Sequence, residues 1–118
     1  MSGFLTREQI LAADDRPTTI LEVPEWGGKI RLRNWTLATA TKWTERLSEA
    51  AQNNAGLDGL FVYTIVNSVV NEEGELMFSE KDAKHLLEKA KAPAQRVFDA
   101  VQAMGKVDGE TIEDSKKN

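Results

Sequence analysis

One segment of the chain, residues 57–70, is apolar on nearly every face of a helical wheel. A helix with no polar face is buried on all sides in a folded protein, so this segment constrains the fold more than any other. Its middle, residues 61–66, is rich in β-branched and aromatic side chains and would also suit a buried strand, which periodicity alone does not distinguish from a helix. A length of about 14 residues favours the helix. The rest of the chain must therefore provide elements that cover this segment.

Ahead of this segment the chain has the pattern of a β-hairpin. Residues 18–23 are rich in β-branched side chains, and residues 29–34 alternate between apolar and basic side chains, so both are predicted to be strands. The connection, residues 24–28, ends in two glycines able to take the positive φ that a tight turn requires. Arg31 and Arg33 share one face of the second strand. We expect that face to be solvated, with pairing to a partner's carboxylates as the alternative.

Two helices are predicted from their N-terminal caps and apolar spacing. Thr6 and Gln9 form a capping box for a short helix over residues 7–13. Thr36 caps a long helix that runs to about residue 54, with apolar residues recurring at spacings of three and four. We expect this apolar stripe to face the core. It consists of Leu37, Ala40, Trp43, Leu47 and Ala50 or Ala51.

Two further helices are predicted after the apolar segment. Ser79 and Asp82 form the N-terminal cap of a helix that begins at Glu80. Pro93, at a first-turn position, starts the last helix, and Gly105 is placed just past its end. The apolar residues of the first helix are Ala83, Leu86, Leu87 and Ala90, and those of the second are Val97, Phe98, Val101 and Met104.

Together these elements predict an α+β fold. It is a mainly helical domain with an N-terminal two-stranded antiparallel hairpin followed by about four helices. We expect a single globular domain over residues 1–105. Residues 106–118 carry few sizeable apolar side chains, so we expect a disordered C-terminal tail there.

The composition disfavours several classes of function. The chain has 15 basic and 19 acidic residues, and a net charge of −4 has the wrong sign for a nucleic-acid-binding protein. It has no cysteine, and its one histidine, His85, has no second histidine one turn away, so we expect no metal, no cofactor and no enzymatic activity. No apolar run approaches the roughly 20 residues of a membrane-spanning helix. The first residues lack the pattern of a secretory signal, so we expect a cytoplasmic protein.

Three tryptophans are the most informative large side chains. Trp43 lies inside the long amphipathic helix and is predicted to be a core residue. Trp35, where the second strand meets that helix, is predicted to be packed at the junction. Trp26, in the hairpin connection, is either tucked under the sheet or presented to a partner, which makes it the better candidate contact.

Two short segments and the order of the elements point to a family. Residues 20–28 read Ile-Leu-Glu-Val-Pro-Glu-Trp-Gly-Gly, and residues 71–79 read Asn-Glu-Glu-Gly-Glu-Leu-Met-Phe-Ser. Between them lie the strand at residues 29–34, the long helix and the apolar helix, and a helical pair follows. This arrangement, over about residues 5–105, resembles the tail assembly chaperones of long-tailed, siphovirus-type bacteriophages.

The resemblance implies a function. Such chaperones bind the tape measure protein, a long hydrophobic helical rod, keep it soluble while tail tube subunits polymerise around it, and are absent from the finished virion. We therefore expect the tape measure protein as partner, in the host cytoplasm, with self-association as a further possibility. An apolar helical partner needs an apolar contact surface. For it we predict Trp26, Trp35, Met77 and Phe78, which lie at turns and junctions and not on the regular stripes.

The family commonly makes a second, longer product by programmed ribosomal frameshifting near the end of the short reading frame, and this product would contact the tail tube protein. Residues 115–118, Ser-Lys-Lys-Asn, are compatible with an adenine-rich slippery run, and an ordinary soluble C-terminus is the alternative. The function has alternatives too. One is a permanent head–tail connector or tail completion protein of the particle, and another is a small regulatory binding domain with no phage connection.

Overall fold

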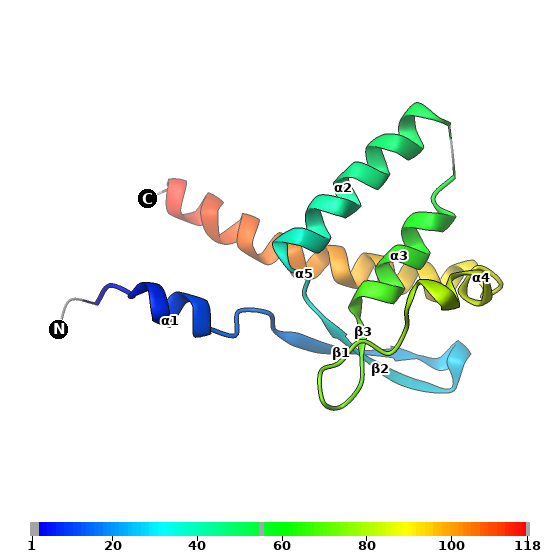
Figure 1. The fold of residues 1–118 in the computed structure, drawn as a ribbon, viewed down its shortest axis with the longest axis horizontal. Coiled ribbons are helices and arrows are strands. Elements are labelled where there is room, and N and C mark those ends of the chain that lie inside the picture. The colour runs from blue at the N-terminus through cyan, green and yellow to red at the C-terminus, as the bar shows by residue number, and fades with distance from the viewer. Residues whose placement is uncertain (1–2, 55, 118) are drawn as a thin grey trace.

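The computed structural model describes residues 3–54 and 56–117, and of residues 106–117 the backbone alone. In chain order the elements are α1 (Arg7–Ala12), β1 (Thr18–Val23), the 3-10 helix η1 (Pro24–Trp26), β2 (Gly28–Arg33), α2 (Leu37–Gln52), α3 (Asp58–Ser68), β3 (Val69–Val70), the 3-10 helix η2 (Glu80–Asp82), α4 (Ala83–Leu86) and α5 (Lys91–Lys117). In Figure 1, α5 passes behind α3, and the sheet lies below both. The predicted α+β class is confirmed.

Helix α3 forms from the all-apolar segment and is the most buried helix. Eight of its eleven residues are buried. Thr64, which is fully buried, is accommodated because its hydroxyl donates to the Leu60 carbonyl one turn earlier, at 2.9 Å. Of the two structures that the sequence left open, residues 58–68 form the helix and not the strand. The last two residues of the segment, however, leave the helix and form strand β3.

The sheet is antiparallel, with strand order β1-β2-β3. The predicted hairpin is present, with a register that runs from Thr18 opposite Arg33 to Val23 opposite Gly28. Of the two glycines in the connection, only Gly27 takes a positive φ, of 82°, because the next glycine already begins β2. The sequence prediction missed β3, whose two residues pair with Arg31 and Leu32 of β2. A strand of two residues has too short a pattern to be recognised in the sequence.

The core lies between the inner face of the sheet and helices α3, α4 and α5. Because side chains alternate along a strand, Leu32 and Val69 point inward from the same face of the sheet. They join a cluster of buried side chains from all three helices. Its members are Leu32, Phe61, Val62, Ile65, Val66, Val69, Leu86, Ala94, Val97 and Val101.

Helix α2 differs from the prediction in how it is packed. Thr36 caps it as expected, and its hydroxyl accepts a hydrogen bond from the backbone N–H of Thr39 at 3.1 Å. The stripe residues Ala40, Trp43 and Ala50 are half-buried toward the body of the protein, but no residue of α2 is buried, so the predicted core-facing stripe is present only in part. Leu37 is 89% exposed, and Trp43 is half-buried and not a core residue. The neighbouring elements cover only part of the length of the apolar stripe, so the residues at its ends remain in solvent.

The helix predicted to begin at Glu80 is interrupted. The capping box of Ser79 and Asp82 is present, but it starts the 3-10 turn η2, and α4 then ends at Leu86. The backbone N–H groups of Glu88 and Lys89 donate to carbonyls three residues back, which tightens the chain into a turn before α5 begins. Leu87, predicted on the apolar stripe, is therefore 53% exposed.

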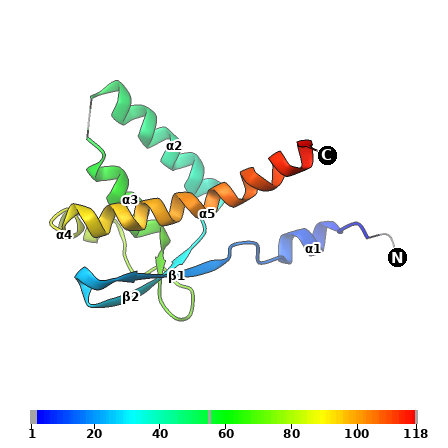
Figure 2. The same cartoon turned by 180° about the vertical axis from the view of Figure 1, so that it is seen from behind.

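The first and last elements of the described chain are helices. Helix α1 has the predicted capping box of Thr6 and Gln9, buries none of its residues, and stands apart from the body in both views (Figures 1 and 2). The helix predicted to end at Gly105 continues as α5 to Lys117, so that predicted end is wrong. The predicted tail at residues 106–118 lies outside the described side chains and stays a prediction, as does the single domain over residues 1–105.

Candidate binding surfaces

Two of the four predicted contact residues, the tryptophans, are held within the fold. Trp26 is half-buried and packs against the core cluster. Trp35 is also half-buried, and its indole Nε1 donates to the Ser68 hydroxyl at 2.7 Å. Its ring centroid lies 6.0 Å from those of both Trp43 and Tyr63. These contacts give Trp35 a packing role at the junction where it was predicted.

The other two residues, Met77 and Phe78, are neighbours in the chain with different surroundings. Phe78 is half-buried against the core cluster, whereas Met77 is 57% exposed. The backbone N–H of Met77 donates to the Val69 carbonyl at 3.1 Å, which ties this segment to β3. The structure thus presents Met77 at the surface and does not gather the four residues at one place, and their role as contacts stays a prediction.

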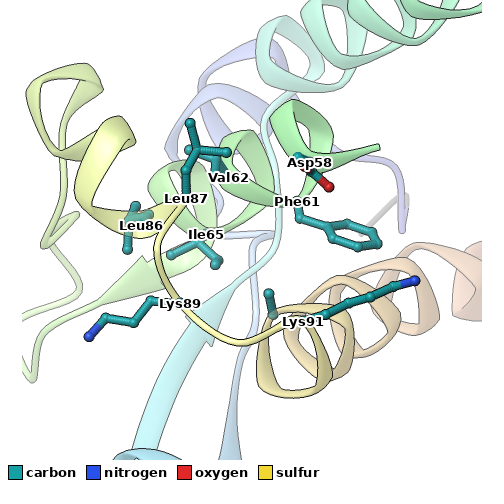
Figure 3. Close-up of a pocket in the computed structure, with 9 residues that line it drawn as sticks. Asp58, Phe61, Val62, Ile65, Leu86, Leu87, Lys89 and Lys91 are labelled. Carbon is teal, nitrogen blue, oxygen red and sulfur yellow. The ribbon is translucent and has the colours of Figure 1, made fainter. Parts of the chain in front are cut away.

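The sequence prediction missed a groove between α3, α4 and α5 (Figure 3). We call it the helix groove. Its volume is about 190 Å³, below the roughly 300–1,000 Å³ typical of sites for drug-sized ligands. Apolar side chains form its floor, and Asp58, Lys89 and Lys91 stand at its edge. The floor residues are Phe61, Val62, Ile65, Leu86, Leu87 and Ala94. A surface of this size and composition suits a protruding side chain of another protein better than a small molecule.

A second hollow, of about 140 Å³, continues the helix groove toward α2. Val62 and Leu87 line both, so the apolar floor is continuous. Arg46 borders the far end, where its guanidinium pairs with Glu80 at 3.5 Å and lies 4.9 Å from the centre of the Tyr63 ring. The sequence signal for this surface was Leu87, which was predicted only as one apolar position of the helix that begins at Glu80.

The opposite side of the sheet presents the second surface, the outer sheet face. We define it by Ile20, Arg31, Val70 and Met77, which line a shallow hollow of about 340 Å³. Ile20 is 54% exposed, Arg31 is half-buried and Val70 is buried at the base. The helices pack on the inner face of the sheet, so this outer face is open.

Arg33, on the same side of β2, is held within the chain. Its Nη2 pairs with Asp14 at 3.1 Å, and its Nη1 donates to the Gly74 carbonyl at 3.3 Å. The pKa of Asp14 lies below its usual value, first because its carboxylate accepts the backbone N–H of Arg16 and then because of Arg33. Arg33 therefore fastens the segment before β1 to the loop after β3, and is not free to bind a partner.

An ion pair at the other end of the hairpin holds it against α5. The two Arg96 nitrogens donate to the two carboxylate oxygens of Glu25 at 2.6 and 2.7 Å. These bonds lower the pKa of Glu25 to about 2 and raise that of Arg96. A bidentate pair fixes both distance and orientation. It positions the hairpin connection, including Trp26.

Other kinds of site were sought in the described part of the chain. There, no three histidine, aspartate or glutamate side chains gather where they could hold a metal ion. None of the described helices is long and apolar enough to cross a membrane.

Comparison with known proteins gives a likeness among solved structures. No protein-family model and no curated protein sequence matches the chain. Among solved structures, the tail assembly chaperone of bacteriophage HK97 superposes with a TM-score of 0.56 and 19% sequence identity, covering 80% of this chain and 88% of that one. At this identity the likeness concerns the fold. The α+β fold of this chain is thus similar to that of a phage tail assembly chaperone.

Proposed function

We propose that this protein is a phage tail assembly chaperone that binds the tape measure protein and keeps it soluble during assembly of the tail tube. The observation that carries the proposal is the shared fold with the HK97 tail assembly chaperone over most of both chains. In this proposal the protein acts by binding and not by catalysis. It works in the host cytoplasm and is absent from the mature virion.

The helix groove supports the proposal because of its shape and lining. An apolar helical rod presents side chains at intervals of three and four residues, and such side chains are bound by apolar grooves between helices. The continuous floor from Ala94 to Val62 and Leu87 offers this kind of surface. Leu87 is 53% exposed, and a bound apolar helix would remove its side chain from water.

The net charge of the chain also suits the role. A chaperone that carries an apolar partner must keep the complex dispersed, and a net charge of −4 opposes aggregation of loaded complexes. We extend the proposal to contact with the tail tube protein through a frameshifted longer product, and to self-association. A negative balance of charge does not favour nucleic acid as a partner.

Coexpression with overlapping fragments of the tape measure protein from the same genome tests the function. We expect the chain to raise the soluble fraction of at least one fragment and to copurify with it. The variant Leu87→Asp should weaken binding at least tenfold, about 1.4 kcal/mol, because it places a charge on the apolar floor. Leu37→Asp is the matched control, since Leu37 is 89% exposed on α2, outside the groove, and this variant should bind like the unmodified chain.

Failure of every fragment to bind would contradict the proposed function. Equal loss of binding in both variants would contradict the assignment to the helix groove. Mass spectrometry of purified virions separates the chaperone from the alternative: stoichiometric presence of this chain in the particle would favour a head–tail connector or tail completion protein.

A further inference from the structure

We propose that Gly59 is a specificity-determining residue of the helix groove, because its missing side chain leaves room for a large apolar side chain of the bound tape measure segment. The inference rests on the proposed function and deepens it, since it identifies the position of the groove that admits an anchor residue of the partner. It concerns the second hollow of the groove, which residues of α3 and α4 line together.

The fold itself does not require a glycine at this position. Gly59 is the second residue of α3, and its φ does not lie in the left-handed region that favours glycine. A Cβ atom there would have no heavy atom of a neighbouring described element within 4 Å. Glycine lowers the stability of a helix relative to alanine because its backbone loses more freedom on folding. Gly59 therefore weakens α3 without serving the packing of the chain.

The space beside Gly59 belongs to the helix groove. Gly59 is exposed and lines the second hollow, whose volume is about 140 Å³. The lining also contains Arg46 and Glu80, which pair with each other at 3.5 Å, so their charges compensate. Its other members are apolar or aromatic: Val62, Tyr63, Val66, Ala83 and Leu87. Such a lining suits an apolar side chain of a partner and not a charged one.

The shape of the hollow explains why a glycine matters there. Binding energy at protein interfaces is concentrated in a few large side chains that fill pockets of the partner. Because position 59 lines the hollow, a side chain there would take up part of its volume and exclude such an anchor. Val62 and Leu87 line both hollows, so the apolar stripe of one bound helix can place a side chain in each.

A second glycine inside a helix lacks this setting. Gly105 lies within α5, is exposed, and also has a φ outside the left-handed region. A Cβ atom at Gly105 would likewise have no heavy atom of a neighbouring described element within 4 Å. The described lining of the helix groove does not include Gly105. Gly105 thus shares the backbone and the open surroundings of Gly59 but not the groove, which makes it the matched control.

The first measurement is stability, which needs no partner. Gly59→Ala and Gly59→Leu place better helix formers in α3, so both should shift the midpoint of urea unfolding upward. Gly105→Ala and Gly105→Leu should shift it upward for the same reason. Circular dichroism checks that each variant is folded.

The second measurement is affinity, by isothermal titration calorimetry of the full chain with the tape measure fragment that copurifies with it. Gly59→Leu should weaken binding at least tenfold because its side chain occupies the hollow, and Gly59→Ala should weaken it less. Both Gly105 variants should bind like the unmodified chain. Substitution of Gly59 therefore changes stability and binding in opposite directions, whereas substitution of Gly105 changes stability alone.

The outcomes separate this inference from the proposed function. If a fragment binds and Gly59→Leu binds it as tightly as the unmodified chain does, the inference is overturned and the proposed function stands. A lower urea midpoint for Gly59→Ala also overturns the inference, because the glycine would then serve the fold. So does equal weakening by Gly105→Leu, which would place the contact outside the hollow. Failure of every fragment to bind contradicts the proposed function and this inference with it.

Discussion

Helix α3 has neighbours of two different kinds. On the α5 side the contact is apolar and buried: Ala94, Val97 and Val101 lie in the same cluster as Ile65 of α3, and the rings of Phe61 and Phe98 lie 5.0 Å apart. On the α2 side, no residue of the neighbouring helix is buried. The two sides are held by different forces, although both neighbours are amphipathic helices in the sequence.

Hydrogen bonds and aromatic rings make the contact on the α2 side. The Tyr63 hydroxyl donates to the Thr39 carbonyl at 2.9 Å, and burial raises the pKa of that hydroxyl, which keeps it protonated as a donor. Trp35, just before α2, donates to Ser68 of α3. The Trp43 ring lies 6.2 Å from that of Phe98, which connects α2 to α5.

The comparison teaches that an apolar stripe shows which face of a helix can be buried, and not how much of it will be. Burial needs neighbours along the whole stripe. Helix α5 has α3, α4 and the sheet beside it, whereas α2 contacts chiefly α3 and single rings of other elements. Stability should therefore depend on volume on the α5 side and on directed bonds on the α2 side.

The largest expected effect is on the α5 side. Ile65 is 1% exposed, so Ile65→Ala should leave a cavity and lower the free energy of unfolding by about 2–5 kcal/mol. Leu47→Ala on α2, at a residue 38% exposed, is the control and should cost less than about 1 kcal/mol. Urea unfolding followed by circular dichroism measures both. Equal costs would show that α2 is as well packed as α5 and break the comparison.

A smaller effect is expected from the directed bonds of the α2 side. Trp35→Phe keeps an aromatic ring but removes the indole donor to the Ser68 hydroxyl, which is fully buried. Leaving a buried acceptor unpaired should cost about 1–3 kcal/mol in the same urea measurement. Trp26→Phe is the control, since its indole N–H makes no hydrogen bond to the described residues, and it should cost less. A neutral Trp35→Phe would mean that the ring contacts alone hold this side.

The smallest expected effect is at the solvent edge of the α5 side, where Arg96 binds Glu25. The pKa of Glu25 is about 2 in the folded chain and 4.5 in the reference state. A lowered folded pKa means that this stabilisation is fully present above about pH 4.5 and is lost as the pH falls toward 2. Glu25→Gln should therefore lower the urea midpoint slightly at pH 7 and have no effect relative to the unmodified chain near pH 2.

The control for this prediction is Glu22→Gln, at an exposed residue of β1 that forms no ion pair within the described part of the chain. Its urea midpoint should follow that of the unmodified chain at both pH values. A Glu25→Gln midpoint that stays shifted by the same amount down to pH 2 would show that the substitution acts through packing and not through the ion pair.

Much of the fold follows from short-range signals. The capping boxes at Thr6 and Ser79 join residues three apart, and both are present in the structure. Gly27 provides the positive φ of the hairpin connection because a side chain is strained there. Such features depend on neighbouring residues, so local sequence is sufficient to predict them.

The candidate surfaces were less accessible to prediction. Leu87 fits the apolar spacing of a helix, yet the turn into α5 leaves it exposed in the helix groove. Arg31 and Arg33 are equivalent in the alternating pattern, but Asp14 and the Gly74 carbonyl bind Arg33, whereas Arg31 forms no ion pair with the residues that the structure describes. Those partners lie 19 and 41 residues away from Arg33, beyond the reach of periodicity.

The sequence by itself determined that residues 57–70 would be the centre of the molecule, since side chains that are apolar on every face have no favourable place in water. It also determined where α1 and α2 begin, because the caps at Thr6 and Thr36 are local hydrogen bonds. Only the tertiary structure decided that Val69 and Val70 join the sheet, that α2 stays half-exposed and that Arg33 pairs with Asp14. Each of these depends on which distant elements come to lie side by side, and that is set by the packing of the whole chain.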